Sequence, residues 1–186
     1  MTETPFSGIH LLSAPGEVMV PRPATERLVE LAAERFGDGS ARVADVGTGS
    51  GAIAVALGTL VPGARIWATD TSAAAVRLAR SNVSRHGLGD RVDVLHADLL
   101  DGVPGGLDFV VANLPYLPDS VRAERPELAG EPAEAVFAPG DGLGHYRRLL
   151  EACKCALRPE GAVAIQLHRR VIVTEAKELG ELRLAA

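Results

Sequence analysis

A turn with alternating glycines is the first feature of this chain that could bind a ligand. Gly47, Gly49 and Gly51 alternate with Thr48 and Ser50, directly after an apolar run. Glycine lets the backbone turn sharply and approach a ligand where a Cβ would collide, and a following helix presents unpaired N–H groups. A dinucleotide site has the spacing G-x-G-x-x-G, with the pyrophosphate at the helix N-terminus. The alternating spacing therefore favours a nucleoside cofactor without a pyrophosphate, such as S-adenosylmethionine (SAM).

An acidic residue at the end of the next apolar stretch fits the same cofactor. Asp70 lies 19 positions after Gly51 (70 − 51 = 19). There its carboxylate could accept hydrogen bonds from both ribose hydroxyls. An ordinary strand-to-helix turn, with Asp70 only capping a helix that begins near Ser72, is the alternative. The order of strand, glycine turn, helix, strand and acid favours the cofactor site.

A second apolar run leads into Asn113, Leu114, Pro115 and Tyr116. An amide nitrogen is a poor nucleophile because its lone pair is delocalised, but a site that fixes both N–H hydrogens can orient it toward an electrophile. The Asn113 side-chain oxygen could accept one hydrogen bond, and the Leu114 carbonyl, directed by Pro115, the other. Tyr116 offers an aromatic face to the flat acceptor, and most of the rate gain would come from positioning. A turn that only ends a strand is the alternative.

Apolar runs alternate with helical patterns along the chain. Strand candidates lie at residues 42–46, 65–69, 91–95, 108–112 and 162–167. Helical patterns lie at residues 23–36, 52–60, 72–86 and 145–157. Strands joined by helices pair in parallel through right-handed crossovers. We therefore expect an α/β fold with a doubly wound, mostly parallel sheet.

The candidate ligand-binding residues fall at one edge of this expected sheet. Ligands of such sheets bind outside the carboxyl ends of the strands, and the glycine turn, Asp70, Asp98 and Asn113 each follow a strand candidate. Residues 115–144 are rich in Pro and Gly and have no clear periodicity. Because a loop this long inside a compact domain is usually functional, we predict a substrate-facing lid.

The composition fits one domain. The 186 residues are 47% hydrophobic and 23% charged, enough to bury one core. We divide the chain into an N-terminal segment and helix (1–37), a catalytic core (38–168) and a C-terminal helix (169–186). A net charge of −5 and a pI near 5.5 disfavour nonspecific attraction to nucleic acid. Arg77, Arg80 and Arg85 could form a basic stripe on the helix at 72–86, but without aromatic residues between them it is weak support for nucleic-acid binding.

Several other residues are expected to have no special chemistry. Cys153 and Cys155 are expected to be reduced thiols of a cytoplasmic protein. The five histidines share no metal-ligand spacing. Arg147 and Arg148 could support the lid or be solvated, and we favour the solvated face. No run of about 18 apolar residues occurs, and the start lacks a signal-peptide pattern. We therefore expect no metal and no membrane attachment.

An ordered set of motifs extends from about Val18 to about Leu167. It comprises Val20-Pro21-Arg22-Pro23-x-Thr25-Glu26, Asp45-Val46-Gly47-Thr48-Gly49-Ser50-Gly51, Asn113-x-Pro115-Tyr116, Glu131-Pro132, Gly140-Asp141-Gly142-Leu143 and Tyr146-Arg147. This set is similar to the motifs of the HemK/PrmC family of protein glutamine methyltransferases. The resemblance implies the class I SAM-dependent methyltransferase fold. It also implies methylation of the glutamine side chain in the Gly-Gly-Gln motif of class 1 peptide release factors.

The same resemblance implies roles for individual residues. The turn from Gly47 to Gly51 and Asp70 would hold SAM. Asp98 and Leu99 would flank the adenine, and Arg22 would lie beside the cofactor. The segment from Asn113 to Tyr116 would hold the acceptor amide near the sulfonium methyl group.

Three departures from the family pattern keep other functions open. Leu114 stands where the family has proline, and Asn-Leu-Pro-Tyr resembles the ribosomal RNA adenine dimethyltransferases. The segment from Ile165 to His168 replaces Leu-Glu-Ile-Gly. We expect no small helical domain before Pro21, and after His168 a helix at 173–179 or at most a shortened hairpin. The alternatives are methylation of an exocyclic amine in RNA or DNA or of a small metabolite, and a non-catalytic SAM-binding module.

Overall fold

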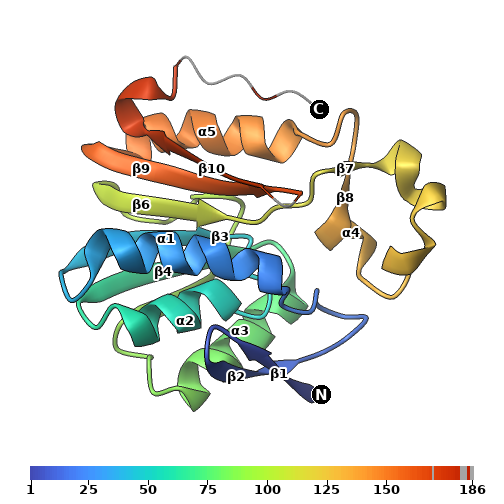
Figure 1. Ribbon diagram of the computed structural model, residues 1–186, viewed down its shortest axis with the longest axis horizontal. Coiled ribbons are helices and arrows are strands. Elements are labelled where there is room, and N and C mark those ends of the chain that lie inside the picture. Colours follow the sequence, from blue (N-terminus) through green and yellow to red (C-terminus); the bar gives the residue numbers. More distant parts are fainter. Residues whose placement is uncertain (169, 181–183, 185–186) are drawn as a thin grey trace.

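The computed structural model describes residues 1–168, 170–180 and 184. Its centre is a six-stranded sheet in the order β10-β9-β6-β3-β4-β5, in which all neighbours are parallel except the β9–β10 pair. The strands are β3 (Ala41–Val46), β4 (Ala64–Asp70), β5 (Val92–His96), β6 (Leu107–Ala112), β9 (Leu157–Leu167) and β10 (Arg170–Glu175). The predicted doubly wound, mostly parallel sheet is confirmed (Figure 1).

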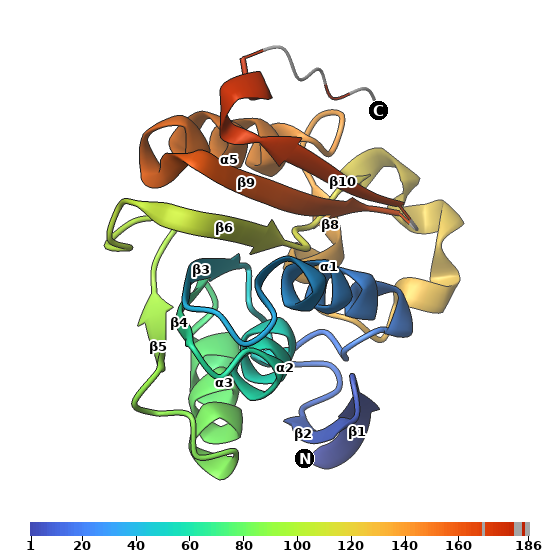
Figure 2. The ribbon, with the colours of Figure 1, turned by 60° about the vertical axis from the view of Figure 1, so that its left-hand side comes forward.

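Helices cover both faces of the sheet (Figures 1 and 2). They are α1 (Glu26–Phe36), preceded by a 3-10 turn at Pro23–Thr25, α2 (Ala52–Leu60), α3 (Ala73–Arg85) and α5 (Gly144–Ala156). The first three pack in one apolar core with Val43 and Phe109, whereas α5 packs in a second core with Ala44 and Val110. Because successive strand side chains point to opposite faces, neighbouring residues of β3 and β6 belong to different cores.

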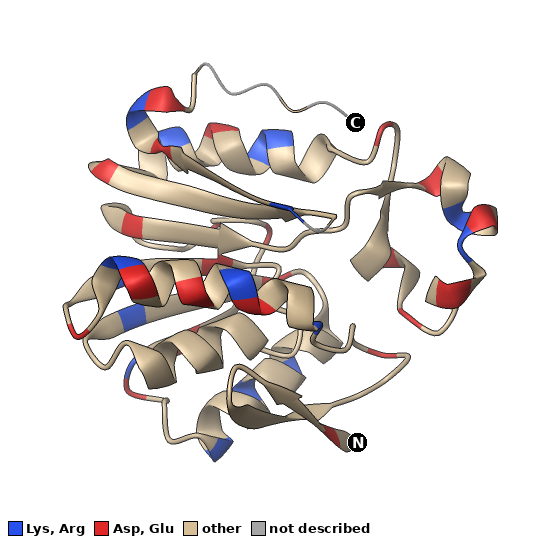
Figure 3. Cartoon of the chain, in the orientation of Figure 1, with Lys and Arg blue, Asp and Glu red and all other residues tan. Residues whose placement is uncertain are grey.

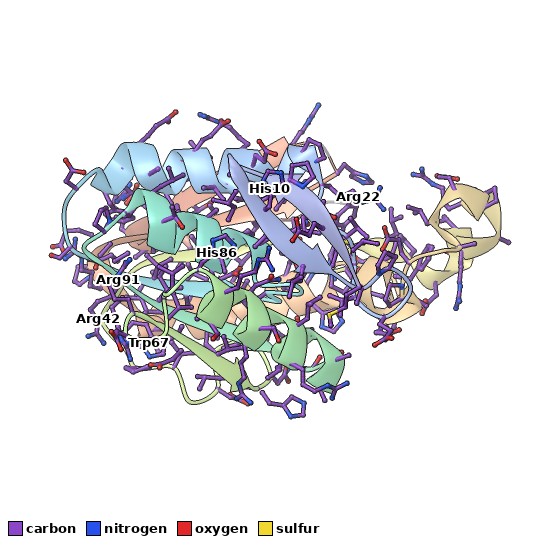
Figure 4. The ribbon with its side chains drawn as sticks, turned by 90° about the horizontal axis from the view of Figure 1, so that it is seen from below. His10, Arg22, Arg42, Trp67, His86 and Arg91 are labelled. Carbon is purple, nitrogen blue, oxygen red and sulfur yellow. The ribbon has the colours of Figure 1, made fainter. Side chains whose placement is uncertain are left out.

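An N-terminal hairpin, which the sequence patterns did not predict, lies against α3. Its antiparallel strands are β1 (Thr2–Phe6) and β2 (Ile9–Ser13). The Asn82 side chain accepts from Leu12 N at 2.7 Å and donates to Leu12 O at 2.9 Å. Figure 4 shows His10 and His86, whose Nε2 lies 3.0 Å from the His10 carbonyl oxygen.

The hairpin also changes the interpretation of the basic stripe on α3. Arg85 pairs with Glu3 of β1 at 2.5 Å, and Arg80 donates to the Val94 carbonyl at 2.9 Å. Two of the three stripe arginines are therefore engaged within the protein. The stripe as predicted is not a free cationic surface.

The predicted lid has short elements of its own and projects from the sheet (Figure 1). They are β7 (Leu117–Pro118), 3-10 turns at Asp119–Glu124 and Pro126–Leu128, α4 (Ala133–Val136) and β8 (Phe137–Ala138). Leu117, Val136 and Phe137 form a small buried cluster at its base. Charged residues of both signs lie on its outer part (Figure 3). No helix of the described residues is long and apolar enough to cross a membrane.

The predicted helix at 173–179 is wrong in its first half, and its second half holds only a 3-10 turn at Ala176–Glu178. Residues 170–175 form β10, which pairs antiparallel with β9 in the register Arg170↔Leu167 to Glu175↔Ala162. The β-branched residues 171–174 prefer a pleated strand because their χ1 freedom is restricted in a helix. A shortened C-terminal hairpin, the other expectation, is what β9 and β10 form. Part of the predicted C-terminal segment, residues 169, 181–183 and 185–186, lies outside the described residues, and the three-part division of the chain stays a prediction.

Candidate active site

A cavity of about 300 Å³ opens at the carboxyl ends of β3, β4 and β6. Its walls come from a strap before α1 (residues 17–22), the glycine turn, the ends of these strands, and the lid. Eleven of the thirteen predicted site residues line it: Arg22, Gly47, Thr48, Gly49, Ser50, Asp70, Asp98, Leu99, Asn113, Leu114 and Pro115. Gly51 and Tyr116 are not among the lining residues.

The three glycines of the turn all have a left-handed backbone, but they have different structural roles. Gly47 has φ +72°, and a Cβ there would lie 2.5 Å from Leu114 Cδ2. The glycine turn therefore closely approaches the segment Asn113–Tyr116, which we call the acceptor segment. Gly51 has φ +81°, and its Cβ would lie 3.1 Å from the Ala79 Cα. Gly51 therefore lets α2 pack on α3. Its contact with the cofactor stays a prediction.

Asp70 is fixed by the backbone around it. Its Oδ2 accepts from Gly49 N at 2.9 Å and its Oδ1 from Ser72 N at 2.8 Å. The Ser72 hydroxyl, rather than Asp70, caps α3 by accepting from Ala75 N at 3.3 Å. The Asp70 carboxylate is thus held at the cavity wall with lone pairs left for ribose hydroxyls.

A second carboxylate is completely buried beneath the glycine turn. Asp45 Oδ2 accepts from Thr48 Oγ1 at 2.6 Å and from Ala54 N at 3.1 Å, whereas its buried Oδ1 makes no hydrogen bond. Burial disfavours the charged carboxylate and raises the pKa of Asp45 to about 7.

This shift predicts a pH dependence of stability. Between pH ~4, where the unfolded side chain titrates, and about 7, where the folded one does, the folded protein binds more protons. The free energy of unfolding should therefore fall as pH rises through this interval and level off above it. Asp45→Asn keeps an acceptor for Thr48 and Ala54 and removes this dependence. Urea unfolding from pH 5 to pH 8 measures it, and parallel curves for the two proteins would contradict the raised pKa.

Asn113 is oriented by a partner on the other wall. Its Nδ2 donates to Thr25 Oγ1 at 3.1 Å, which leaves its Oδ1 as an acceptor. Asn113 and the two residues after it line the cavity. This is the arrangement that the sequence predicted for one of the two amide hydrogens.

Tyr146 braces the acceptor segment from below, a role that the sequence patterns did not show. This fully buried residue of α5 accepts from Leu114 N at 2.9 Å, and its hydroxyl lies 3.1 Å from Leu114 O and 2.5 Å from Gln166 O. A hydroxyl carries one hydrogen, and the shorter contact to Gln166 takes it. Because a carbonyl oxygen has two lone pairs, that of Leu114 can also accept a hydrogen from a substrate. Burial raises the pKa of Tyr146, so the hydroxyl stays protonated.

Tyr116 lies beside the cavity instead of on its wall. Its half-buried ring contacts the His168 ring edge-on, with centroids 4.8 Å apart. Burial raises the pKa of Tyr116. His168, where the family pattern has glycine, has a left-handed backbone with φ +56°.

The second glycine of the Gly140–Leu143 motif, Gly142, lies against the backbone of Tyr116. A Cβ at this position would lie 2.2 Å from the Tyr116 carbonyl oxygen, and φ is +83°. Asp141 accepts from Leu143 N at 3.1 Å and pairs with Arg147, which holds the pKa of Asp141 below its usual range, at about 2. The motif therefore lets the end of the lid approach the acceptor segment.

The comparisons with known proteins agree with this geometry. Residues 23–125, more than half of the chain, match the family model described as "Methyltransferase small domain". The chain belongs to this methyltransferase family. A release factor glutamine methyltransferase of Deinococcus radiodurans is 40% identical over 179 residues, 95% of this chain and 63% of that protein. One of Moorella thermoacetica is 42% identical over 153 residues, 81% and 54% respectively. These matches confirm the resemblance to the HemK/PrmC family.

A solved structure supports the fold. The hMettl16 catalytic domain, in complex with the MAT2A 3'UTR hairpin 6, superposes with a TM-score of 0.66 at 21% identity, covering 83% of this chain and 60% of that one. The chain spans about half to two thirds of the length of the curated relatives that it matches.

The cavity fits SAM. Four carboxylates, those of Glu17, Asp70, Asp98 and Glu134, line it together with one arginine, Arg22. An excess of carboxylates suits a ligand that carries a sulfonium and an ammonium group. The glycine turn leaves room where a Cβ would stand.

Histidine 145, in the first turn of α5, also lines the cavity, although its spacing gave no sign of a functional role. The N-terminal hairpin contributes Phe6, which is buried at the same cavity. Neither residue is part of a motif. They reach the site through tertiary packing.

Glu131 joins the lid to the strap before α1. Its Oε1 pairs with Arg22 at 2.7 Å and its Oε2 accepts from Val20 N at 3.3 Å. Figure 4 shows Arg22 beside the start of α1. One carboxylate therefore closes the wall formed by two segments that are distant in sequence.

Removing this carboxylate should loosen the cavity. We expect Glu131→Ala to weaken SAM binding roughly ten-fold, since a charge-assisted hydrogen bond is worth about 1.5–3 kcal/mol. Glu127→Ala is the matched control, because Glu127 is a lid glutamate whose pair with Arg125 is exposed on both sides. Calorimetric titration with SAM compares the two variants. Equal affinities would show that Glu131 does not hold the lid.

Proposed function

We propose that this chain transfers a methyl group from SAM to the side-chain amide nitrogen of a glutamine, in a peptide release factor. The observation that carries the proposal is the pair of acceptors in one cavity wall, Asn113 Oδ1 and the Leu114 carbonyl. A primary amide has two N–H hydrogens, and these acceptors can take both. The names of the curated relatives support the choice of a release factor glutamine.

The residues of the chain would act by binding and orienting. Asp70 would hold the ribose, and the glycine turn would lie against the cofactor. SAM, when bound, supplies an electrophilic methyl group on sulfur. Asn113 and Leu114 would hold the amide so that its nitrogen faces that methyl group in line with the C–S bond. The new N–C bond forms as the C–S bond breaks, and the amide nitrogen loses one proton to water.

One observation favours a second candidate, an exocyclic amine of RNA or DNA. Leu114 replaces the family proline, and a base amine also presents two hydrogens to two acceptors. The net charge of −5 and the engaged arginines of α3 count against a nucleic acid partner. A non-catalytic module would not need the oriented acceptors at Asn113.

Free Cys153 and Cys155 suit the cytoplasm, which we propose as the compartment.

Transfer of radiolabelled methyl from SAM into a fractionated cell extract tests the proposal. Samples are treated with protease or with nuclease before the label is followed. Label in a protease-sensitive band of release-factor size is the expected result. Label lost to nuclease would replace the glutamine by a base amine, and SAM binding without any label would contradict methyl transfer to either class of macromolecule.

A further inference from the structure

We propose that Arg148 of α5 is a positioning residue for cofactor binding, because its ion pair holds Asp98 at the adenine end of the cavity. This inference rests on the proposed use of SAM. Arg148 Nη2 lies 2.6 Å from Asp98 Oδ2. The sequence patterns favoured a solvated arginine here over one that supports the lid. Asp98 lines the cavity, whereas Arg148 does not.

The loop that carries Asp98 is only partly covered on the side that faces α5. A second hollow, of about 390 Å³, lies between this loop and α5 and has Asp98, Leu99 and Arg148 among its lining residues. The Leu99 side chain packs against the apolar core that contains α5. The Asp98 carboxylate instead meets Arg148, whose guanidinium reaches it beside the hollow.

The backbone of the same loop is in a rare conformation. Leu99 has φ +50°, which non-glycine residues seldom adopt. Thr69 Oγ1 donates to the Leu99 carbonyl at 2.6 Å, and Ala97 N donates to Asp70 O at 3.0 Å. These bonds fix the loop backbone. The Arg148 pair is the interaction that fixes the Asp98 side chain.

The pair leaves Asp98 able to recognise adenine. Arg148 engages Oδ2, so Oδ1 remains an acceptor. A carboxylate only accepts hydrogen bonds, and it therefore fits the exocyclic amine of adenine but not the carbonyl oxygen of hypoxanthine. If Arg148 keeps Asp98 in place, its loss should reduce both the affinity for SAM and the preference for adenine.

Arg147 offers a matched control on the same helix. It pairs with Asp141 through two contacts, of 2.9 and 2.5 Å, and neither residue lines the cavity. Both arginines have an exposed side chain and an exposed carboxylate partner. If the loss of any surface ion pair on α5 weakened SAM binding, variants of Arg147 and of Arg148 would both show it. An effect that acts through Asp98 would appear only in the Arg148 variant.

The test measures dissociation constants for SAM and for its hypoxanthine analogue by calorimetry. We expect Arg148→Gln to weaken SAM binding on the order of five-fold. It should also reduce the ratio of the dissociation constant of the hypoxanthine analogue to that of SAM. Arg147→Gln should bind as the wild type does, and Arg148→Lys should restore much of the loss. In an Asp98→Asn background, Arg148→Gln should add no further loss. Thermal unfolding of each variant controls for folding.

Three results would overturn the inference while the proposed function stands. One is equal SAM affinity of Arg147→Gln and Arg148→Gln. Another is an Arg148→Gln effect that persists undiminished in the Asp98→Asn background. A wild-type protein that transfers methyl groups but shows no preference for adenine would also overturn it. Wild-type protein that binds no SAM would overturn the proposed function, and this inference with it.

Discussion

Asn113→Ala should lower kcat/KM for methyl transfer by about 100-fold or more, because a misplaced nucleophile loses most of the benefit of positioning. The variant removes the acceptor oxygen that orients one amide hydrogen, while the glycine turn and Asp70 stay in place. SAM affinity should therefore remain close to that of the wild type. Steady-state kinetics and calorimetric SAM titration measure the two quantities separately.

Two controls accompany the Asn113→Ala measurement, a test of folding and a variant of Thr25, the partner of Asn113. Thermal unfolding checks that the variant folds, since Asn113 also bonds Thr25. Thr25→Val removes that hydroxyl and keeps the shape, so it should lower the rate less than Asn113→Ala does. Undiminished turnover of Asn113→Ala would contradict the role of its side chain in holding the acceptor.

Gly142→Ala should impair both folding and activity. Its Cβ would meet the Tyr116 carbonyl oxygen at 2.2 Å, and φ is +83°. A left-handed alanine costs about 1–2 kcal/mol and overpacking about 1–3 kcal/mol, so the free energy of unfolding should fall by about 2–5 kcal/mol. The acceptor segment must also move, which should reduce methyl transfer about 100-fold.

Gly140→Ala separates the cost of a left-handed alanine from the cost of the clash with the Tyr116 carbonyl. Gly140 has φ +66°, but a Cβ there meets nothing within 4 Å. This variant should show only the left-handed penalty of about 1–2 kcal/mol and keep its activity. Urea unfolding and kinetics on both variants measure the difference. Equal losses at the two positions would show that the close approach to Tyr116 is not needed.

The parts of the fold that the sequence predicted are those with local patterns. The helix at 52–60 has the bounds of α2, because a glycine turn marks its start and an apolar run fills it. The glycine turn, Asp70 and Asn113 also lie where the alternation of strands and helices places them, at one edge of the sheet. In these cases neighbouring residues determine the outcome.

The parts that were missed depend on partners distant in sequence. The strand β10 is short, and a short apolar run has no period long enough to distinguish a strand from a helix. Tyr146 reaches Leu114 across 32 positions, and Arg148 reaches Asp98 across 50. Ser7 and Gly8, with φ +46° and +78°, form the turn of the N-terminal hairpin. Their residue types are typical of such turns, so this signal could have been found.

Mass spectrometry of a purified class 1 release factor, after incubation with this protein and SAM, shows whether the glutamine is the methyl acceptor. We expect one added methyl group on the glutamine side chain of the Gly-Gly-Gln motif, and its absence when Asn113→Ala replaces the wild type. An unmodified glutamine, with the methyl group found in RNA or on another residue type, would contradict the claim.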